Sequence, residues 1–252
     1  MENIGYFVRL TELFEAEGIF NFLMEKGKKY DPRNWEDLWR GAPARWILKF
    51  LSLAMASSVD STCLNRRTGA CLVDIKLQQN GSLAPFSISS CFNGAPTGIK
   101  TCLERGQCFY KELAFKEFIK KYNLSEENIP KELIGEFKEF KKSFFQFCLA
   151  CHAEANAIYF AFQPTAGKIL FTTTDPCPEC AKLIVQKGIA AVIYSVPYKT
   201  DEHGPRLADQ SKRLFQEAKI PCINVQVPEE YLSWIFSNLR LAGQAIPDSR
   251  FD

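Results

Sequence analysis

Two short stretches constrain the fold of this chain more than any other feature of its sequence. They are residues 151–158, which read CHAEANAI, and residues 175–181, which read DPCPECA. His152 offers an imidazole and Cys177 and Cys180 offer two thiolates, a donor set that suits tetrahedral zinc. Three protein ligands leave the fourth position open for water, as in catalytic rather than structural sites. We therefore expect the fold to bring both stretches to one metal ion.

A carboxylate accompanies these ligands. Glu154 lies two residues after His152, close enough to reach the open position without being a ligand itself. It could therefore take a proton from water held there and deliver it to a substrate atom.

Each ligand stretch is predicted to begin a helix. Pro176 and Pro178 flank Cys177 just before an apolar run, and a first helical turn tolerates proline. The partial positive charge of a helix N-terminus favours a thiolate. The helix after His152 is expected to run through Phe162.

Taken singly, the two motifs have ordinary explanations, since C-x-x-C can be a redox pair and a lone histidine is usually packed. In this order, with the intervening glutamate, they resemble the H-x-E…P-C-x-x-C signature of zinc-dependent base deaminases.

Composition narrows the class of protein. The 252 residues can form one enlarged domain or a domain with an appendage, and we favour the second. The 31 basic and 29 acidic residues nearly balance, so no strongly cationic surface is expected. A small-molecule partner is therefore favoured, and nucleic acid is possible but not favoured. The ten cysteines do not suggest a small disulfide scaffold, since the start lacks a signal-peptide pattern. A reduced, cytoplasmic setting is expected for the same reason. No apolar run approaches the ~20 residues that a membrane span needs, so we expect no membrane partner.

Hydrophobic periodicity predicts an α/β fold. A buried helix is expected over residues 44–60, followed by an antiparallel hairpin that turns at Asn80 and Gly81. Strands at 168–173, 190–194 and 222–227 alternate with helices, so these three should run parallel in a mixed five-stranded sheet. We expect a helical N-terminal appendage over 1–43, a main domain over 44–228 with an insert at 110–147, and a closing helix and tail over 229–252.

Further motifs make the resemblance more specific. They are STC and RRTGA in residues 61–70, FNGAPTG in 92–98, HAEANAI in 152–158 and PCPECAKLI in 176–184. Over residues 44–227 the chain resembles the deoxycytidylate (dCMP) deaminase family, which implies a three-layer α/β/α cytidine-deaminase-like fold. The resemblance also implies hydrolysis of dCMP to dUMP and ammonia, with His152, Cys177 and Cys180 on zinc and Glu154 transferring protons.

The resemblance implies substrate contacts as well. The residue matching Asn93 meets the sugar, and the backbone near Ala70 approaches the base. Plain turn chemistry also explains the Asn and Gly around Asn93. Tyr198 follows a predicted strand at its carboxyl end, where open sheets place ligands, and could contact the base or the phosphate.

A second, structural zinc occurs in bacterial members of the family. Cys63, Cys102, Cys108 and Cys148 match its ligands, and four sulfurs would close the tetrahedral shell. The alternatives are four unrelated buried thiols, or Cys151 in place of Cys148.

Some departures from the family leave the substrate more open than the reaction. Thr68 and Cys91 stand where valine and glycine are more frequent. The alternatives are a deaminase of a base in tRNA or single-stranded nucleic acid, one acting on a purine, and a non-catalytic zinc-stabilised module. Phenylalanine and lysine interleave in residues 110–147, which could bind a nucleic-acid strand, but we favour amphipathic helices with a solvated face. Relatives associate, so we expect a homo-oligomer.

Overall fold

One mixed sheet forms the centre of the molecule. The computed structural model describes residues 42–77, 83–125, 129–197 and 205–227, with residues 229, 231–233 and 235. Five strands pair in the order β2-β1-β3-β4-β5. They are β1 (Gly69–Leu77), β2 (Leu83–Phe92), β3 (Ile169–Thr174), β4 (Ala191–Val196) and β5 (Cys222–Asn224). β1 is antiparallel to β2 and β3, whereas β3, β4 and β5 run parallel, so the predicted hairpin and parallel strands are confirmed.

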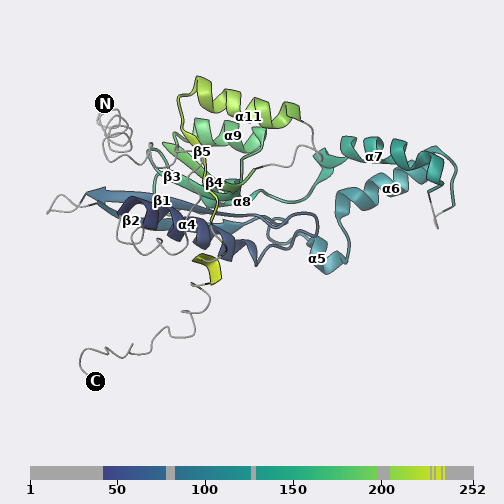
Figure 1. The fold of residues 1–252 in the computed structure, drawn as a ribbon. Coiled ribbons are helices and arrows are strands. Elements are labelled where there is room, and N and C mark those ends of the chain that lie inside the picture. The colour runs from purple at the N-terminus through teal and green to yellow at the C-terminus, as the bar shows by residue number, and fades with distance from the viewer. Residues whose placement is uncertain are drawn as a thin grey trace.

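Helices cover both faces of this sheet (Figure 1). One face packs against α4, and the other packs against α8, α9 and α11. Their bounds are α4 (Ala42–Ser58), α8 (Ala153–Tyr159), α9 (Pro178–Gln186) and α11 (Pro205–Glu217). Alternate residues of β1 serve the two sides: Cys71 and Val73 join the α4 cluster, and Ala70 and Leu72 join the other. The predicted three-layer α/β/α architecture is thus confirmed, with a separate core on each face.

The α4 core depends on a close approach of helix and sheet. Phe50, Leu51 and Ala54 lie on one face of α4 at helical spacing and are buried. Phe50 meets Phe171 of β3 at 5.4 Å between ring centroids. At the start of β1, a Cβ on Gly69 would lie 1.9 Å from the Ala54 carbonyl oxygen. Glycine is therefore required where the helix crosses the strand.

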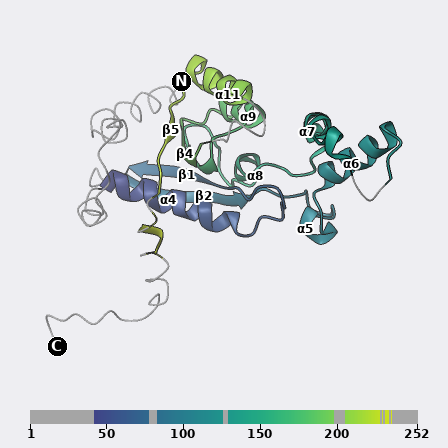
Figure 2. The same ribbon diagram turned by 45° about the vertical axis from the view of Figure 1, so that its right-hand side comes forward.

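An arm projects beyond the sheet between β2 and α8 (Figures 1 and 2). It contains α5 (Cys102–Arg105), α6 (Phe109–Lys121), the 3₁₀ turn η2 (Lys131–Leu133), α7 (Ile134–Ser143) and the 3₁₀ turn η3 (Phe145–Phe147). Phe118 is fully buried and packs against the rings of Tyr122, Phe137 and Phe140. The aromatic residues thus pack within the helical hairpin, as expected for amphipathic helices.

Some element boundaries differ from the sequence expectations. Helix α8 ends at Tyr159 instead of running through Phe162. Pro164 disfavours helix in the residue before it, and Phe160 and Phe162 are largely exposed, so no packing holds a further turn. Strand β5 stops at Asn224, short of the expected 227, although the Val225 N–H still donates to the Tyr194 carbonyl at 2.8 Å.

Other expectations fall outside the described residues. These are the appendage over 1–43, apart from the two residues that begin α4, and most of the closing helix and tail over 229–252. The division into domains therefore stays a prediction. Of the helices that are described, none combines the length and the apolar composition of a membrane span.

The Gly69 contact generates a stability prediction. Gly69→Ala should lower the free energy of unfolding by about 3 kcal/mol, because the new methyl group collides with the backbone of α4. Gly135→Ala is the matched control, since a Cβ there meets nothing within 4 Å and alanine is the better helix former, by up to about 1 kcal/mol. Urea denaturation of both variants checks the pair. Equal midpoints for Gly69→Ala and the parent chain would contradict the close approach.

Candidate functional site

The three predicted metal ligands lie at the beginnings of two helices. His152 is the N-cap residue of α8, and Cys177 is the N-cap residue of α9. Pro178 occupies the first turn of α9, and the Cys180 N–H donates to the Cys177 sulfur at 3.5 Å. The predicted helix starts are confirmed, and both point at one place on the α8 and α9 side of the sheet.

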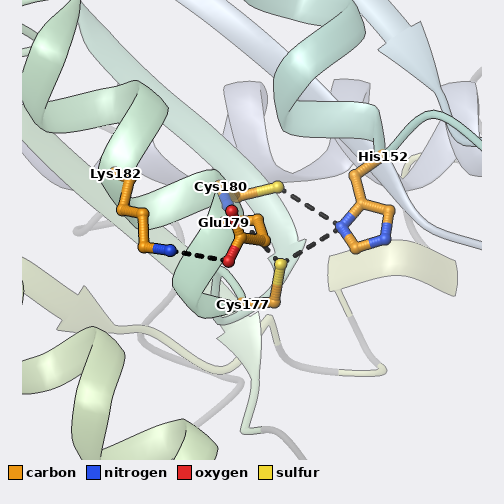
Figure 3. A network of polar contacts seen from close by, with 5 residues as sticks. All are labelled: His152, Cys177, Glu179, Cys180 and Lys182. Atoms are coloured by element: carbon orange, nitrogen blue, oxygen red, sulfur yellow. Dashed lines mark hydrogen bonds and ion pairs between the residues drawn. The ribbon is translucent and has the colours of Figure 1, made fainter. Parts of the chain in front are cut away.

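The ligand atoms converge as a tetrahedral metal requires. Nδ1 of His152 lies 3.3 Å from the sulfurs of Cys177 and Cys180 (Figure 3). All three atoms lie within 4.8 Å of one another, and no other group of three potential ligands in the described ranges does so. Zinc bonds of about 2.3 Å to sulfur and about 2.0 Å to nitrogen imply an N to S separation of about 3.5 Å across a tetrahedron. The donor set and its geometry therefore fit zinc.

Hydrogen bonds among His152, Cys177 and Cys180 shift the pKa of each side chain. The hydrogen bond from Cys180, and after it that from His152, lowers the pKa of Cys177 far below its ordinary value. The pKa of Cys180 is raised because it donates to Cys177 and because it is buried. The hydrogen bond to Cys177 raises the pKa of His152 to about 9. A thiolate is therefore already favoured at Cys177, which is the form that binds a metal.

Glu154 lies beside this group and is almost completely buried, with 4% of its surface exposed. Burial raises the pKa of its carboxyl to about 7, because a charged carboxylate is poorly solvated there. The charge of His152 lowers the pKa of this carboxyl, that of Cys177 raises it, and a hydrogen bond with Cys180 lowers it. The site thus combines three metal donors with a carboxyl that can hold or release a proton near neutral pH.

The end of β2 holds α8 in position. Gly94 and Cys151 exchange two backbone hydrogen bonds, of 3.1 and 2.8 Å. The Asn156 side chain donates to the Phe92 carbonyl at 2.8 Å, and the Ser89 hydroxyl donates to the Ala157 carbonyl at 2.6 Å. Hydrogen bonds therefore hold both Cys151, the residue before His152, and the following helix α8 to the β2 segment.

Asn93 joins this strand end to the loop that precedes β1. Its Oδ1 accepts from the Ser61 hydroxyl at 2.6 Å and from the Thr68 N–H at 2.8 Å. Its Nδ2 donates to the Arg66 carbonyl at 2.9 Å. The side chain is buried, and it organises a whole loop in addition to any contact with a ligand.

Two cavities adjoin the metal ligands. The inner one, of about 60 Å³, is bordered by Asn93, Glu154 and His152. The outer one, of about 560 Å³, lies beyond Cys177 and Cys180 and extends to Gln210 and Ser211 of α11.

The helices and 3₁₀ turns of the arm contribute three residues to these cavities, two of them aromatic, and the third, Gln146, borders the outer cavity. Tyr110 borders the inner cavity, and Phe145 borders both. The sequence analysis did not single out either residue. Aromatic residues recur throughout the arm, and nothing local distinguishes these two.

The cysteines matched to a second zinc lie close together but do not reach ligand distance. Cys102 and Cys63 raise the pKa of Cys148, and Cys102 and Cys148 raise that of Cys108, in each case after the larger effect of burial. Although all four are described, no three of their sulfurs meet within 4.8 Å. The structure thus places the four thiols in one region without a formed site.

Of the two remaining predicted substrate contacts, one lies within the described residues and the other does not. Ala70 is fully buried in β1, between Cys91 of β2 and Thr172 of β3, and its side chain belongs to the core cluster that includes Cys180. Tyr198 lies outside the described residues.

Comparisons with known proteins agree with this geometry. Residues 44–196, more than half of the chain, match the family model described as the cytidine and deoxycytidylate deaminase zinc-binding region. A deoxycytidylate deaminase of Schizosaccharomyces pombe is 30% identical over 162 residues, which cover 63% of this chain and 39% of that protein. The chain therefore spans well under half the length of that relative.

Two further similarities extend the comparison. A deoxycytidylate deaminase of Enterobacteria phage T4 is 28% identical over 162 residues, which cover 61% of this chain and 79% of that protein. The crystal structure of dCMP deaminase from the cyanophage S-TIM5, in complex with dCMP and dUMP, superposes with a TM-score of 0.43 at 23% identity, covering 70% of this chain and 94% of that one. The match to the family model shows that this chain belongs to the cytidine and deoxycytidylate deaminase zinc-binding family, and its mixed sheet and helical layers are the fold expected of that family.

Proposed function

We propose that this chain is a zinc-dependent hydrolytic deaminase of a cytosine nucleotide, converting dCMP and water into dUMP and ammonia. The observation that carries the proposal is the convergence of one imidazole nitrogen and two sulfurs beside a buried carboxyl. Relatives named deoxycytidylate deaminase support the choice of nucleotide. The packing of the arm's aromatic rings against one another, with Phe118 fully buried, favours a mononucleotide over a stacked nucleic-acid strand.

In this proposal His152, Cys177 and Cys180 hold the ion through Nδ1 and the two sulfurs. Zinc bound there supplies a Lewis acid that allows water to attack at neutral pH. Glu154 accepts a proton from the attacking water and delivers it to the ring nitrogen, and a further proton passes through its carboxyl to the departing amino group. Its burial keeps bulk water from competing for these protons.

The role of Glu154 is testable with a matched pair of variants. Glu154→Gln keeps the shape of the side chain but cannot carry the proton, so kcat for dCMP should fall by about 100-fold or more. Glu139→Gln makes the same change at a residue whose carboxylate is exposed on α7, where it pairs with Lys142, and should keep the parent rate. Ammonia release should be measured on a panel of cytosine and adenine nucleosides, nucleotides and oligonucleotides. An active Glu154→Gln enzyme refutes the role, and a panel without any turnover refutes the proposed function.

The side chain of Asn93 has one amide proton available for a contact with the substrate. Oδ1 already accepts two hydrogen bonds and Nδ2 donates one, while no described residue accepts the second N–H of Nδ2. Asn93 also borders the inner cavity beside Glu154. These facts support donation from Asn93 to a sugar hydroxyl of the nucleotide.

A substrate lacking the 3′-hydroxyl tests this contact. The parent enzyme should prefer dCMP over its 3′-deoxy analogue by about 10-fold in kcat/KM, the worth of one neutral hydrogen bond. Asn93→Ala should abolish the preference, and should also cost about 2 kcal/mol of stability because partners in the loop lose their hydrogen bonds. Asn224→Ala, at an exposed residue of β5, should keep the preference. A preference that survives in Asn93→Ala shows that Asn93 only organises the loop.

We also propose a second, structural zinc held by Cys63, Cys102, Cys108 and Cys148. Support comes from the family resemblance and from the mutual influence of these thiols. Cys102 begins α5 and Cys108 is the N-cap of α6, so two of the four proposed ligands lie at the beginnings of helices. Self-association remains a prediction from the resemblance.

Zinc content separates the two sites. The purified chain should contain about two zinc ions, one for each set of ligands. Cys180→Ala and Cys148→Ala should each lose about one, whereas Cys222→Ala, at a cysteine outside both sets, should keep both. Elemental analysis after extensive dialysis provides the measurement. About one zinc ion in the parent chain, unchanged in Cys148→Ala, would rule out the structural site.

A further inference from the structure

The two ends of the projecting arm meet again at the active site. Tyr110 lies in the first turn of α6, and Phe145 begins η3 after α7. Their ring centroids lie 5.5 Å apart with an interplanar angle of 82°, which is a favourable edge-to-face pair. Tyr110 is only 5% exposed, so its ring is held by the surrounding protein and can fix the position of Phe145.

Phe145 stands at the junction of the two cavities. Of the described residues that the arm contributes up to η3, Phe145 alone borders both of them, and it shares this place with Cys148, Ala150, His152, Asp175 and Cys177 outside that range. Phe147, in the same 3₁₀ turn, borders neither, is 45% exposed and packs against Phe144.

The size of the inner cavity requires a ligand to reach this junction. Its volume is about 60 Å³, whereas pockets for small molecules usually have about 300 Å³ or more. A nucleotide with its base at Glu154 and its sugar at Asn93 is therefore too large to lie wholly inside the inner cavity. The part that the inner cavity cannot hold can extend past Phe145, which borders both cavities, toward the outer cavity of about 560 Å³.

We propose that Phe145 is a substrate-contacting residue that packs its ring against the bound nucleotide, and that Tyr110 is the positioning residue that holds this ring. The inference rests on the proposed function and adds a specificity role for the arm. Because the two rings are nearly perpendicular, Tyr110 contacts Phe145 edge to face and not by face-to-face stacking. An aromatic ring that borders both cavities can stack on a base or pack on a sugar. The two ends of the arm, at Tyr110 and Phe145, thus contribute to binding, while the rest of α6 and α7 extends away from the site.

The experiment compares two phenylalanines of one turn. Phe145→Ala should lower kcat/KM for dCMP by about 10-fold or more, mainly through KM, as expected when a stacking contact is lost. Affinity for the product dUMP, measured by calorimetry, should fall in parallel. Phe147→Ala removes the same ring outside both cavities and should stay within about 2-fold of the parent enzyme in both measurements.

Phe145→Leu guards against a folding artefact, because it keeps apolar volume but lacks the aromatic face. Circular dichroism and zinc content should match those of the parent enzyme, while dUMP affinity falls as in Phe145→Ala. If either folded Phe145 variant binds dUMP as tightly as Phe147→Ala does, the inference is overturned and the proposed deaminase stands. If the parent enzyme neither deaminates any cytosine nucleotide nor binds dUMP, the proposed function fails and the inference falls with it.

Discussion

The active site depends on the contact of two helix beginnings across one face of the sheet. Nδ1 of His152 reaches both sulfurs of α9 only because α8 and α9 lie close to the strands. Ala153 and Ala157 of α8 and Ala181 of α9 are fully buried against that face. Such small side chains allow a close approach that larger ones would prevent. The chemistry of the site is therefore built on the packing of alanines.

A second constraint acts at the end of β2, on the same end of the sheet as the metal ligands. The paired backbone hydrogen bonds between Gly94 and Cys151 fix the segment immediately before the imidazole ligand. Asn93, the neighbour of Gly94, fixes the loop before β1 through its side chain. The segment before His152, the end of β2 and the loop before β1 consequently form one hydrogen-bonded network. A buried polar network of this kind is costly to disturb, because every broken bond leaves a desolvated group.

The sequence predicted the parts of this arrangement that depend on local spacing. The ligands His152, Cys177 and Cys180 belong to two short motifs, and the period of apolar residues predicted the strands that bring the motifs together. Boundaries were less accurate, because α8 ends where packing ends and not where apolar residues end. The places of Tyr110 and Phe145 could not be predicted. They meet only when the whole arm folds back on itself, which is a tertiary property.

In the proposed deaminase, the arm would allow the substrate pocket to be varied without altering the metal ligands or Glu154. Its two ends are anchored beside the site, with Tyr110 and Phe145 in contact, while α6 and α7 pack against each other through their own aromatic residues. Because that packing is internal to the arm, its outer part can change in length or charge with little effect on the metal ligands. Changes at the two ends of the arm, where Tyr110 and Phe145 lie, would instead alter the wall of the inner cavity. In the proposed function, the contact of Phe145 with the nucleotide and the proton transfer at Glu154 thus come from different segments, which meet at the inner cavity that both residues border.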